Sequence, residues 1–103
     1  MVRMRSPVQF RSLAQMNVVI LGVYILECRN GRYYVGSAKN VLFRFSQHEN
    51  GKVTATKYVL PVILRGIVPC QTPAEARKLE WKIKKSKSRK VIEQLIDQYP
   101  YRG

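Results

Sequence analysis

The sequence predicts a single α+β domain in which strands and helices follow one another in the order β-β-α-β-α-α. The length of 103 residues is that of one compact domain, and a hydrophobic content of 46% suffices for one core. Three segments are rich in β-branched and aromatic residues, and three others carry hydrophobic residues at helical spacing. Turn and capping residues separate these segments, which allows the order of elements to be assigned.

The first two strands are predicted to form an antiparallel hairpin over residues 18–37. Residues 18–28 are β-branched, aromatic or aliphatic, as is typical of a strand. Asn30-Gly31 is a strong hairpin signal because both residue types tolerate a positive φ. Residues 32–37 then form the returning strand, and residues 62–68 form the third strand.

The first helix is predicted to begin after Asn40, which can cap it, and to run to about residue 49. Gly51 is placed to end this helix, and residues 52–58 read as a loop. The apolar face of this first helix is formed by Val41, Leu42 and Phe45.

The second helix has the clearest start in the chain. Thr72 can cap it, Pro73 occupies its first position and Glu75 its third, which together form a capping box. This helix is predicted to run to about residue 85, and residues 86–88 interrupt it and cap a last helix. The buried stripe of that last helix is predicted to consist of Val91, Ile92, Leu95 and Ile96.

The folded domain is predicted to comprise residues 18–98. Residues 1–17 form a basic, partly flexible extension, and residues 99–103 form a short tail. The N-terminal region is basic and free of acids, as targeting segments are. We interpret the apolar run that follows it as a strand instead, because no small-residue cleavage site follows it. A soluble intracellular protein is therefore expected, in the cytoplasm, the nucleoid or the nucleus.

The composition is strongly basic, with 19 Lys and Arg, 6 Asp and Glu, and a net charge of +13. Such a surface attracts phosphate, from nucleic acid first and from anionic membranes second, and it exceeds what solubility requires. Six carboxylates leave little for a two-metal site or a carboxylate dyad. The sequence contains no run of 18 apolar residues, so it predicts no membrane span. A peripheral membrane protein is the weakest hypothesis. Cys28 and Cys70 are predicted to be reduced, buried thiols, because their spacing fits no metal site.

Two polar groups on the predicted helices are candidates for chemistry. Arg44 and His48 lie four residues apart on one helix face, where both suit a phosphate, although a solvated helix face is the better explanation of the spacing alone. Glu80 lies beside the apolar stripe of its helix, so its carboxylate is placed to bind a hard cation. An ordinary ion pair with Lys84 is the alternative.

Aromatic residues form a third candidate group. Tyr24 alternates with Leu26 on its strand, and only one of Tyr33 and Tyr34 can share its face, because strand side chains alternate. A cross-strand aromatic pair that supports the hairpin is the alternative. Trp81 is placed to stack on a base or to cover the core, and core packing is favoured.

The basic residues between 78 and 90 span two helices and predict a broad positive surface that follows a phosphate backbone, with a merely solvated lysine face as the alternative. The predicted nucleic-acid contacts are Lys39, Lys52, Lys57, Lys82, Lys84, Lys85, Lys87, Arg89 and Lys90.

Taken in order, these residues resemble the GIY-YIG endonuclease domain, from residue 20 to about residue 96. Gly22-Val23-Tyr24 stands for the first tripeptide of the family and Tyr34-Val35-Gly36 for the second, with the hairpin turn between them. Residues 36–40 lead into Arg44-x-x-x-His48, and a later helix carries the single glutamate, Glu80. The sequence looks closest to small stand-alone members and to the Slx-type structure-specific nucleases.

The resemblance implies a small three-stranded antiparallel sheet flanked by helices. It also implies that one cleft gathers a set of catalytic residues while Tyr33 points away. That set is Tyr24, Tyr34, Arg44, His48 and Glu80.

The resemblance further implies that a single Mg²⁺ or Mn²⁺ binds at Glu80 and that Arg44 stabilises the charge that develops on the phosphate. Tyr24 is the candidate general base, with a pKa expected to fall under the influence of Arg44, the metal and the net charge. Tyr34 and His48 would orient the water or share the proton, and the choice among the three bases stays open.

Some positions depart from the family pattern. Valine replaces isoleucine in both tripeptides, and Phe43 stands where relatives often carry a basic residue. The chain carries no RING-like, helix-turn-helix or zinc-finger module, so the N-terminal arginines, or a protein partner, are expected to contribute specificity. The leading hypothesis is a metal-dependent DNA endonuclease that acts on branched or distorted DNA, as in DNA repair. The alternative is a basic nucleic-acid-binding module without catalysis.

Overall fold

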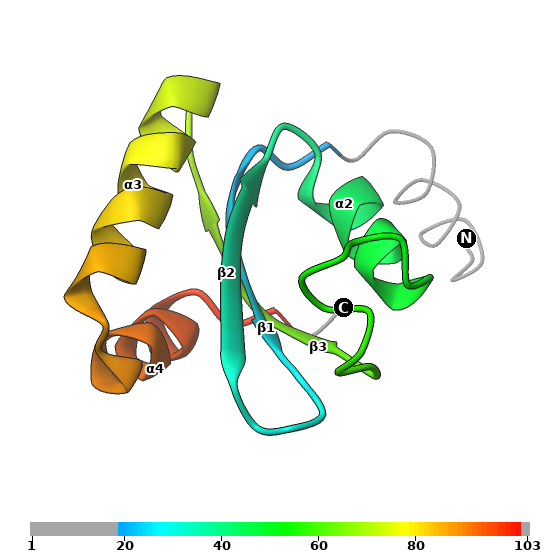
Figure 1. Cartoon of the computed structure of the whole chain (residues 1–103). Helices are drawn as coiled ribbons and strands as arrows, with labels where there is room; N and C mark the ends of the chain where they lie inside the picture. Colours follow the sequence, from blue (N-terminus) through cyan, green and yellow to red (C-terminus); the bar gives the residue numbers. More distant parts are fainter. Residues whose placement is uncertain (1–18, 102–103) are drawn as a thin grey trace, which may run out of the picture.

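The computed structural model describes residues 19–101 and confirms the predicted α+β class and element order (Figure 1). The extension predicted over residues 1–17 lies outside the described residues. The sheet has the strand order β2-β1-β3, and both pairings are antiparallel. The elements are β1 (Gly22–Glu27), β2 (Tyr33–Ala38), α2 (Val41–Glu49), β3 (Ile63–Pro69), α3 (Pro73–Ser86) and α4 (Arg89–Gln98).

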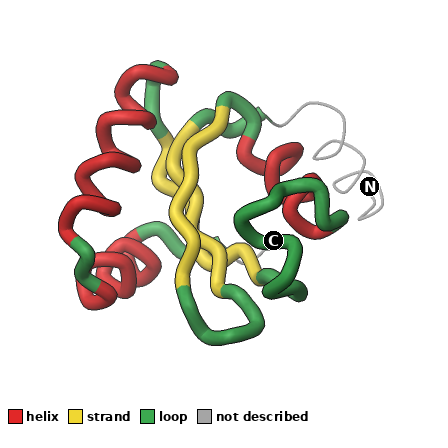
Figure 2. Tube along the Cα trace, in the orientation of Figure 1, coloured by secondary structure: helices red, strands yellow, loops and turns green. Residues whose placement is uncertain are grey.

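The sheet separates two layers (Figure 2): α2 covers one face, and α3 and α4 cover the other. The central strand β1 is buried on both sides, because its residues alternate between the layers. Tyr24 and Leu26 enter the core beneath α2, whereas Val23 and Ile25 enter the core beneath α3 and α4. The two cores therefore meet across a single strand.

The first strand begins later than predicted. The carbonyl groups of Ile20 and Leu21 accept hydrogen bonds from the N–H groups of Val41 and Cys70, so this segment leads into the sheet without forming a ladder. The hairpin turn is a three-residue loop closed by the bond from Cys28 N–H to the Arg32 carbonyl. Only Gly31 has a positive φ, at 83°, and Asn30 does not. A type I turn followed by one left-handed residue requires only one such position.

The predicted helix caps are confirmed. Asn40, Thr72 and Ser88 each accept a hydrogen bond from the backbone N–H three residues later. The capping box differs in one respect, since the Glu75 carboxylate bonds to the N–H of Gln71 and not to that of Thr72. Lys87, at the end of α3, has a left-handed backbone with a φ of 51°.

Two predictions about the helices are wrong. Trp81 is 61% exposed and does not pack in the core. Ala76 and Ile83 of α3 are buried against the sheet, and Leu79 is partly buried there, so Trp81 lies about 200° around the helix from Leu79 and faces solvent. The apolar stripe of α4 is only partly buried, because α4 has few contacts with the rest of the fold.

Both cysteines are free thiols, as predicted, although only Cys28 is buried and Cys70 is partly exposed. Within residues 19–101, no helix has the length and apolar character that crossing a membrane requires.

We expect the core of β1 to dominate stability. Ile25 is fully buried, so Ile25→Ala should lower the free energy of unfolding by about 2–5 kcal/mol, through lost burial and the cavity that remains. Ile63 of β3 is 51% exposed, and Ile63→Ala should cost about 1 kcal/mol or less. Urea unfolding of both variants tests this difference, and equal losses would contradict the assignment of the core.

Candidate active site

A buried chain of hydrogen bonds runs from the central strand to the loop after α2. Tyr24 is 1% exposed, and its phenolic oxygen lies 2.9 Å from Nε2 of His48. The other ring nitrogen of His48, Nδ1, lies 2.8 Å from Oγ1 of Thr56. Both His48 and Thr56 are buried, so each polar group of this chain finds its partner inside the protein.

Gly36 makes this position of Tyr24 possible. The two residues face each other in the β1–β2 register, and a Cβ atom on residue 36 would lie 2.5 Å from the phenolic oxygen of Tyr24. Any side chain at residue 36 would therefore displace the phenol. The glycine of the second tripeptide is thus required by the tyrosine of the first.

Tyr34 completes an aromatic cluster around His48. Its ring centroid lies 5.0 Å from that of His48 and 6.3 Å from that of Tyr24. Tyr33 points into the opposite layer, where the Arg89 guanidinium lies 4.5 Å from its ring centroid. The prediction that only one of these two tyrosines shares a face with Tyr24 is confirmed.

Arg44 lies on α2, one turn before His48. Its Nη1 donates a hydrogen bond of 2.9 Å to Oε1 of Gln47, which fixes the guanidinium on the surface of the helix. Its positive charge lowers the pKa of both Tyr24 and His48, although burial has the larger effect on each. Arg44 therefore acts electrostatically on the buried chain.

Glu80 reaches the other side of β2 from α3. One carboxylate oxygen, Oε1, accepts a hydrogen bond of 2.6 Å from Ser37, and Oε2 lies 2.6 Å from Nζ of Lys84. The same Nζ lies 5.8 Å from the ring centroid of Tyr34. Lys84 thus connects the carboxylate with the aromatic cluster, so the predicted ion pair is present.

Burial controls the pKa values of the chain. Burial, with the nearby Tyr34, raises the pKa of Tyr24 to about 12, and Arg44 only partly opposes this. Burial, followed by Arg44, lowers the pKa of His48 to about 4. Both groups are therefore neutral at pH 7. The expectation of a lowered Tyr24 pKa is wrong for the protein alone, because desolvation outweighs the charge of Arg44.

The residues present fit a hydrated divalent cation. Among residues 19–101, no three His, Cys, Asp or Glu side chains lie together, which is inconsistent with an all-protein cage. Mg²⁺ commonly keeps most of its waters and binds through one or two carboxylates. The partly exposed carboxylate of Glu80 suits that mode, and a cation there would have to compete with Lys84 for Oε2.

The predicted nucleic-acid contacts divide into two sets. Lys39, Lys52 and Lys57 are exposed around α2, and the others are on α3, on α4 or in the turn between these helices. Arg89 is already engaged, by Glu93 and by the carbonyl of Gly31. Lys85 lies over the exposed ring of Trp81, with Nζ 4.6 Å from the ring centroid.

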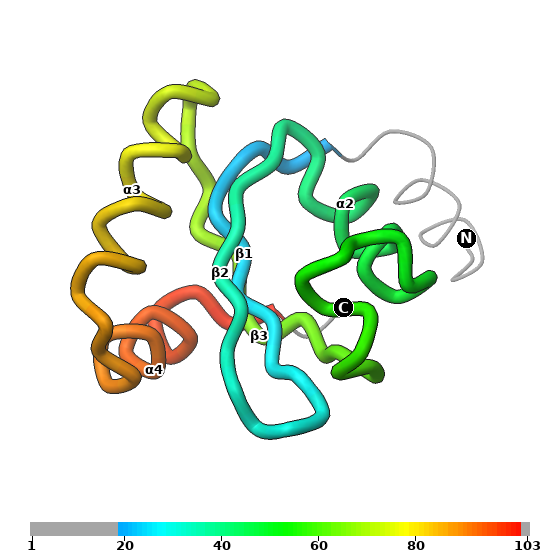
Figure 3. The backbone as a smooth tube through the Cα atoms, in the orientation of Figure 1, coloured from blue at the N-terminus to red at the C-terminus, as the bar shows by residue number. Residues whose placement is uncertain are grey.

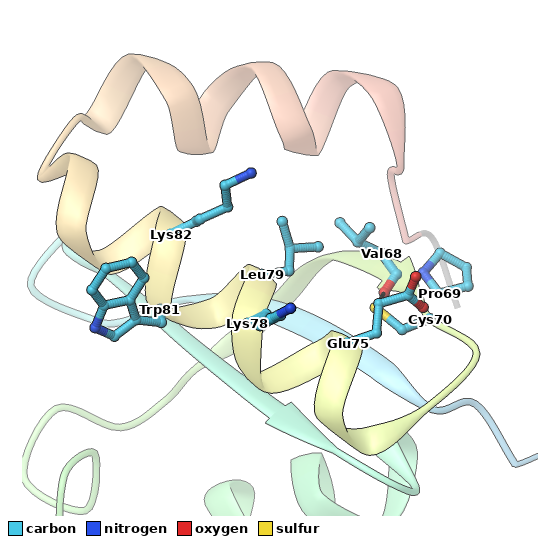
Figure 4. Close-up of a pocket in the computed structure, with 8 residues that line it drawn as sticks. All are labelled: Val68, Pro69, Cys70, Glu75, Lys78, Leu79, Trp81 and Lys82. Carbon is cyan, nitrogen blue, oxygen red and sulfur yellow. Dashed lines mark hydrogen bonds between the residues drawn. The ribbon is translucent and has the colours of Figure 1, made fainter.

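A pocket of about 550 Å³ lies against the face of α3 that carries Lys78, Trp81 and Lys82 (Figure 4). Lys78, Trp81 and Lys82 border it, above an apolar floor that includes Val68 and Leu79. None of the five predicted catalytic residues lines this pocket. It is therefore separate from the site around Glu80.

Sequence reasoning missed three side chains of this arrangement. Thr56 was recognised only as part of a loop, Ser37 only as part of a strand, and Lys84 only as an ion-pair partner or phosphate contact. The alternation of β2 places Ser37 on the face toward α3, which is the one signal that pointed to its contact with Glu80. No spacing in the sequence indicates the contact between Thr56 and His48.

Comparison with known proteins agrees with this geometry. Residues 20–93 match the GIY-YIG catalytic domain. The chain belongs to the GIY-YIG family. Its relatives include a UPF0213 protein of Staphylococcus epidermidis, 43% identical over 60% of this chain and 77% of the relative.

Two further UPF0213 relatives of this GIY-YIG protein come from distant organisms. The one from Bacillus licheniformis is 37% identical over 73% of this chain and 77% of its own length. The one from Halobacterium salinarum is 35% identical over 60% of this chain and 82% of its own length. No solved structure matches the chain significantly.

The lowered pKa of His48 predicts a pH-dependent stability. Between its unfolded pKa of about 6.5 and its folded pKa of about 4, the unfolded chain binds more protons, so stability falls as the pH falls. The loss should be on the order of 3 kcal/mol between pH 7 and pH 4. Urea unfolding across this range tests it, with His48→Gln as the comparison. His48 is the single histidine of the chain, and an equally steep loss in the variant would exclude it as the source.

Proposed function

We propose that this protein is a metal-dependent endonuclease that hydrolyses DNA phosphodiester bonds in branched or distorted DNA. The observation that carries the proposal is the approach of two different groups to β2. The Tyr24–His48–Thr56 chain with Tyr34 lies on one side of this strand, and the Glu80 carboxylate lies on the other. Metal-assisted phosphodiester hydrolysis uses a group that accepts the proton of the attacking water and a ligand that holds the cation.

Glu80 is the residue that would hold the divalent ion. A bound Mg²⁺ or Mn²⁺ would polarise the phosphate and stabilise the leaving oxygen. Ser37 orients the carboxylate by donating a hydrogen bond to Oε1. The other oxygen, Oε2, contacts the exposed Lys84 and is the one that a cation would bind in place of this lysine. Arg44 would stabilise the negative charge that develops on the phosphate in the transition state.

The buried chain would carry the proton of the attacking water. In the tautomer in which Nδ1–H donates to Thr56, Nε2 of His48 accepts the hydrogen bond of the Tyr24 hydroxyl. The raised pKa of Tyr24 and the lowered pKa of His48 both disfavour a proton transfer from Tyr24 to His48 before the water attacks. Tyr24 would therefore act as a relay during the attack of the water: its phenolic oxygen would take the proton of the water while its own proton passes to Nε2 of His48, and no preformed phenolate is used.

The cations support DNA binding by shape. Exposed lysines around α2 and around the turn from α3 to α4 suit contacts with phosphates, which position a duplex without reading its bases. Trp81 stands among such lysines with 61% of its surface exposed, as suits an aromatic platform for an unpaired base. Both features favour a distorted substrate over a defined sequence.

We expect Glu80→Gln to abolish metal-dependent cleavage while it leaves DNA binding intact, because the amide keeps the shape of the side chain and loses its charge. Purified protein would be incubated with duplex, single-stranded, 5′-flap and four-way-junction DNA in Mg²⁺, Mn²⁺ or EDTA. Glu49→Gln is the matched control, since Glu49 is exposed at the end of α2 and its substitution removes the same charge.

The outcomes of this experiment separate two functions. Cleavage by wild type and by Glu49→Gln, but not by Glu80→Gln, supports the endonuclease. Tight, salt-sensitive binding without cleavage by any of the three proteins would favour the non-catalytic nucleic-acid-binding module. Undiminished cleavage by Glu80→Gln would overturn the proposed role of the carboxylate.

Tyr24→Phe should reduce the cleavage rate by about 10²–10⁴-fold, the usual contribution of a positioned proton-transfer group. The change removes the hydroxyl that bonds to His48 and keeps the ring in the core. Tyr99→Phe is the control, because Tyr99 is 41% exposed at the end of α4 and takes no part in the buried chain of hydrogen bonds. Single-turnover cleavage rates measure both effects, and equal rates for the two variants would argue against the relay.

A further inference from the structure

A second cavity lies beside the candidate active site, between β2, the end of α3 and the start of α4. Its volume is about 400 Å³, which is within the range of ligand pockets. Val35, Ile83 and Ile92 contribute apolar surface, and Tyr33 and Tyr34 also line it. Figure 3 shows the turn that joins α3 to α4; α3 packs on β2, whereas α4 packs on β3. We call this cavity the α3–α4 cleft.

The α3–α4 cleft is strongly cationic. Four basic side chains line it: Arg32, Lys84, Lys87 and Arg89. The ion pairs of Lys84 and Arg89 use the carboxylates of Glu80 and Glu93. Arg32 and Lys87 form no ion pair within residues 19–101, so two positive charges are left available to an anion at this cavity.

The cleft shares two residues, Tyr34 and Lys84, with the candidate active site. Lys84 lines the cleft while its Nζ contacts Glu80, and Tyr34 lines the cleft while its ring packs on His48. An anion bound by Arg32 and Lys87 would therefore be a neighbour of the group bound at Glu80. Phosphates that follow one another along a nucleic-acid backbone have this relation.

The backbone of Lys87 gives independent support. This residue ends α3 with a φ of 51°, in the left-handed region where glycine is usual and a side chain is strained. Its N–H bonds to the Lys84 carbonyl, as that of a glycine would. Its side chain is exposed and makes no hydrogen bond to the described part of the chain. Within residues 19–101 the ammonium group of Lys87 therefore has no ion-pair partner, and a bound phosphate would supply one.

We propose that the α3–α4 cleft is a phosphate subsite that binds the DNA backbone next to the scissile phosphate, with Lys87 and Arg32 as its ligands. This inference rests on the proposed endonuclease function and adds the path of the strand, which runs from Glu80 past Tyr34 to the turn between α3 and α4. The surrounding apolar surface of Ile83 and Ile92 suits the sugar that joins two phosphates.

The test compares Lys87→Gln and Lys87→Gly with Lys78→Gln. Lys78 is an exposed lysine of the same helix that lines the separate pocket of Figure 4, so its variant loses the same charge away from the cleft. Fluorescence anisotropy would measure binding to a labelled 5′-flap duplex in EDTA over a range of salt concentrations. Thermal unfolding would be followed for the same proteins.

Both Lys87 variants should bind about eightfold more weakly at 0.1 M salt and lose about 0.9 from the salt slope, as expected for one lost phosphate contact. Lys87→Arg should restore both values, and Lys78→Gln should change affinity less than about twofold. The midpoint of Lys87→Gly should not fall, because glycine relieves the left-handed strain.

Equal effects of the Lys87 and Lys78 variants would overturn the subsite and leave a diffuse positive surface. A lower unfolding midpoint for Lys87→Gly would also overturn the inference, since it would show that the side chain serves the fold. These readouts do not require cleavage. An intact subsite in a protein that does not cleave would therefore reject the proposed function alone, and cleavage without a specific Lys87 effect would reject the subsite alone.

Discussion

The position of the Tyr24 phenol in the middle of the sheet constrains the rest of the molecule. The phenol lies over Gly36, where no other residue leaves room, and it bonds to His48 across the core. His48 in turn requires Thr56 as a partner for its second nitrogen, so the loop after α2 is held against the sheet by a side chain. An unsatisfied buried polar group costs about 1–3 kcal/mol. The three residues therefore order one another, and α2 is fixed relative to β1 by polar contacts as well as by packing.

The same burial determines which chemistry the chain of hydrogen bonds can perform. Desolvation separates the pKa values of Tyr24 and His48, raising one to about 12 and lowering the other to about 4. Both groups are thus neutral over a wide pH range and differ in the direction in which each can exchange a proton. A surface pair would be screened by solvent and would titrate close to ordinary values. The pKa values of both groups are consequently determined mainly by their burial, and the charge of Arg44 makes a smaller contribution to each.

The sequence was sufficient for the order of elements, the three helix caps and the alternation that separates Tyr33 from Tyr34, because these depend on local spacing. It was insufficient where a contact joins distant segments. Thr56 contacts His48 only because the loop after α2 folds back on the helix. The pKa of Tyr24 is raised mainly by its burial, which the net charge of the sequence does not indicate. Trp81 was misjudged for a different reason: its aromatic character suggested core packing, but a residue two positions after Leu79 on a helix faces away from the sheet.

Strand β2 explains how groups from two separate layers come together. Within residues 19–101 it is an edge strand that pairs only with β1, and its side chains alternate, so Tyr34 and Gly36 face the layer of α2 while Ser37 faces the layer of α3. A shift of one residue in its register would reverse these faces, removing Ser37 from Glu80 and the glycine from Tyr24 at once. The β1–β2 register is therefore a condition for the site itself. The same register pairs the two tripeptides, since each supplies one residue of the contact between Tyr24 and Gly36.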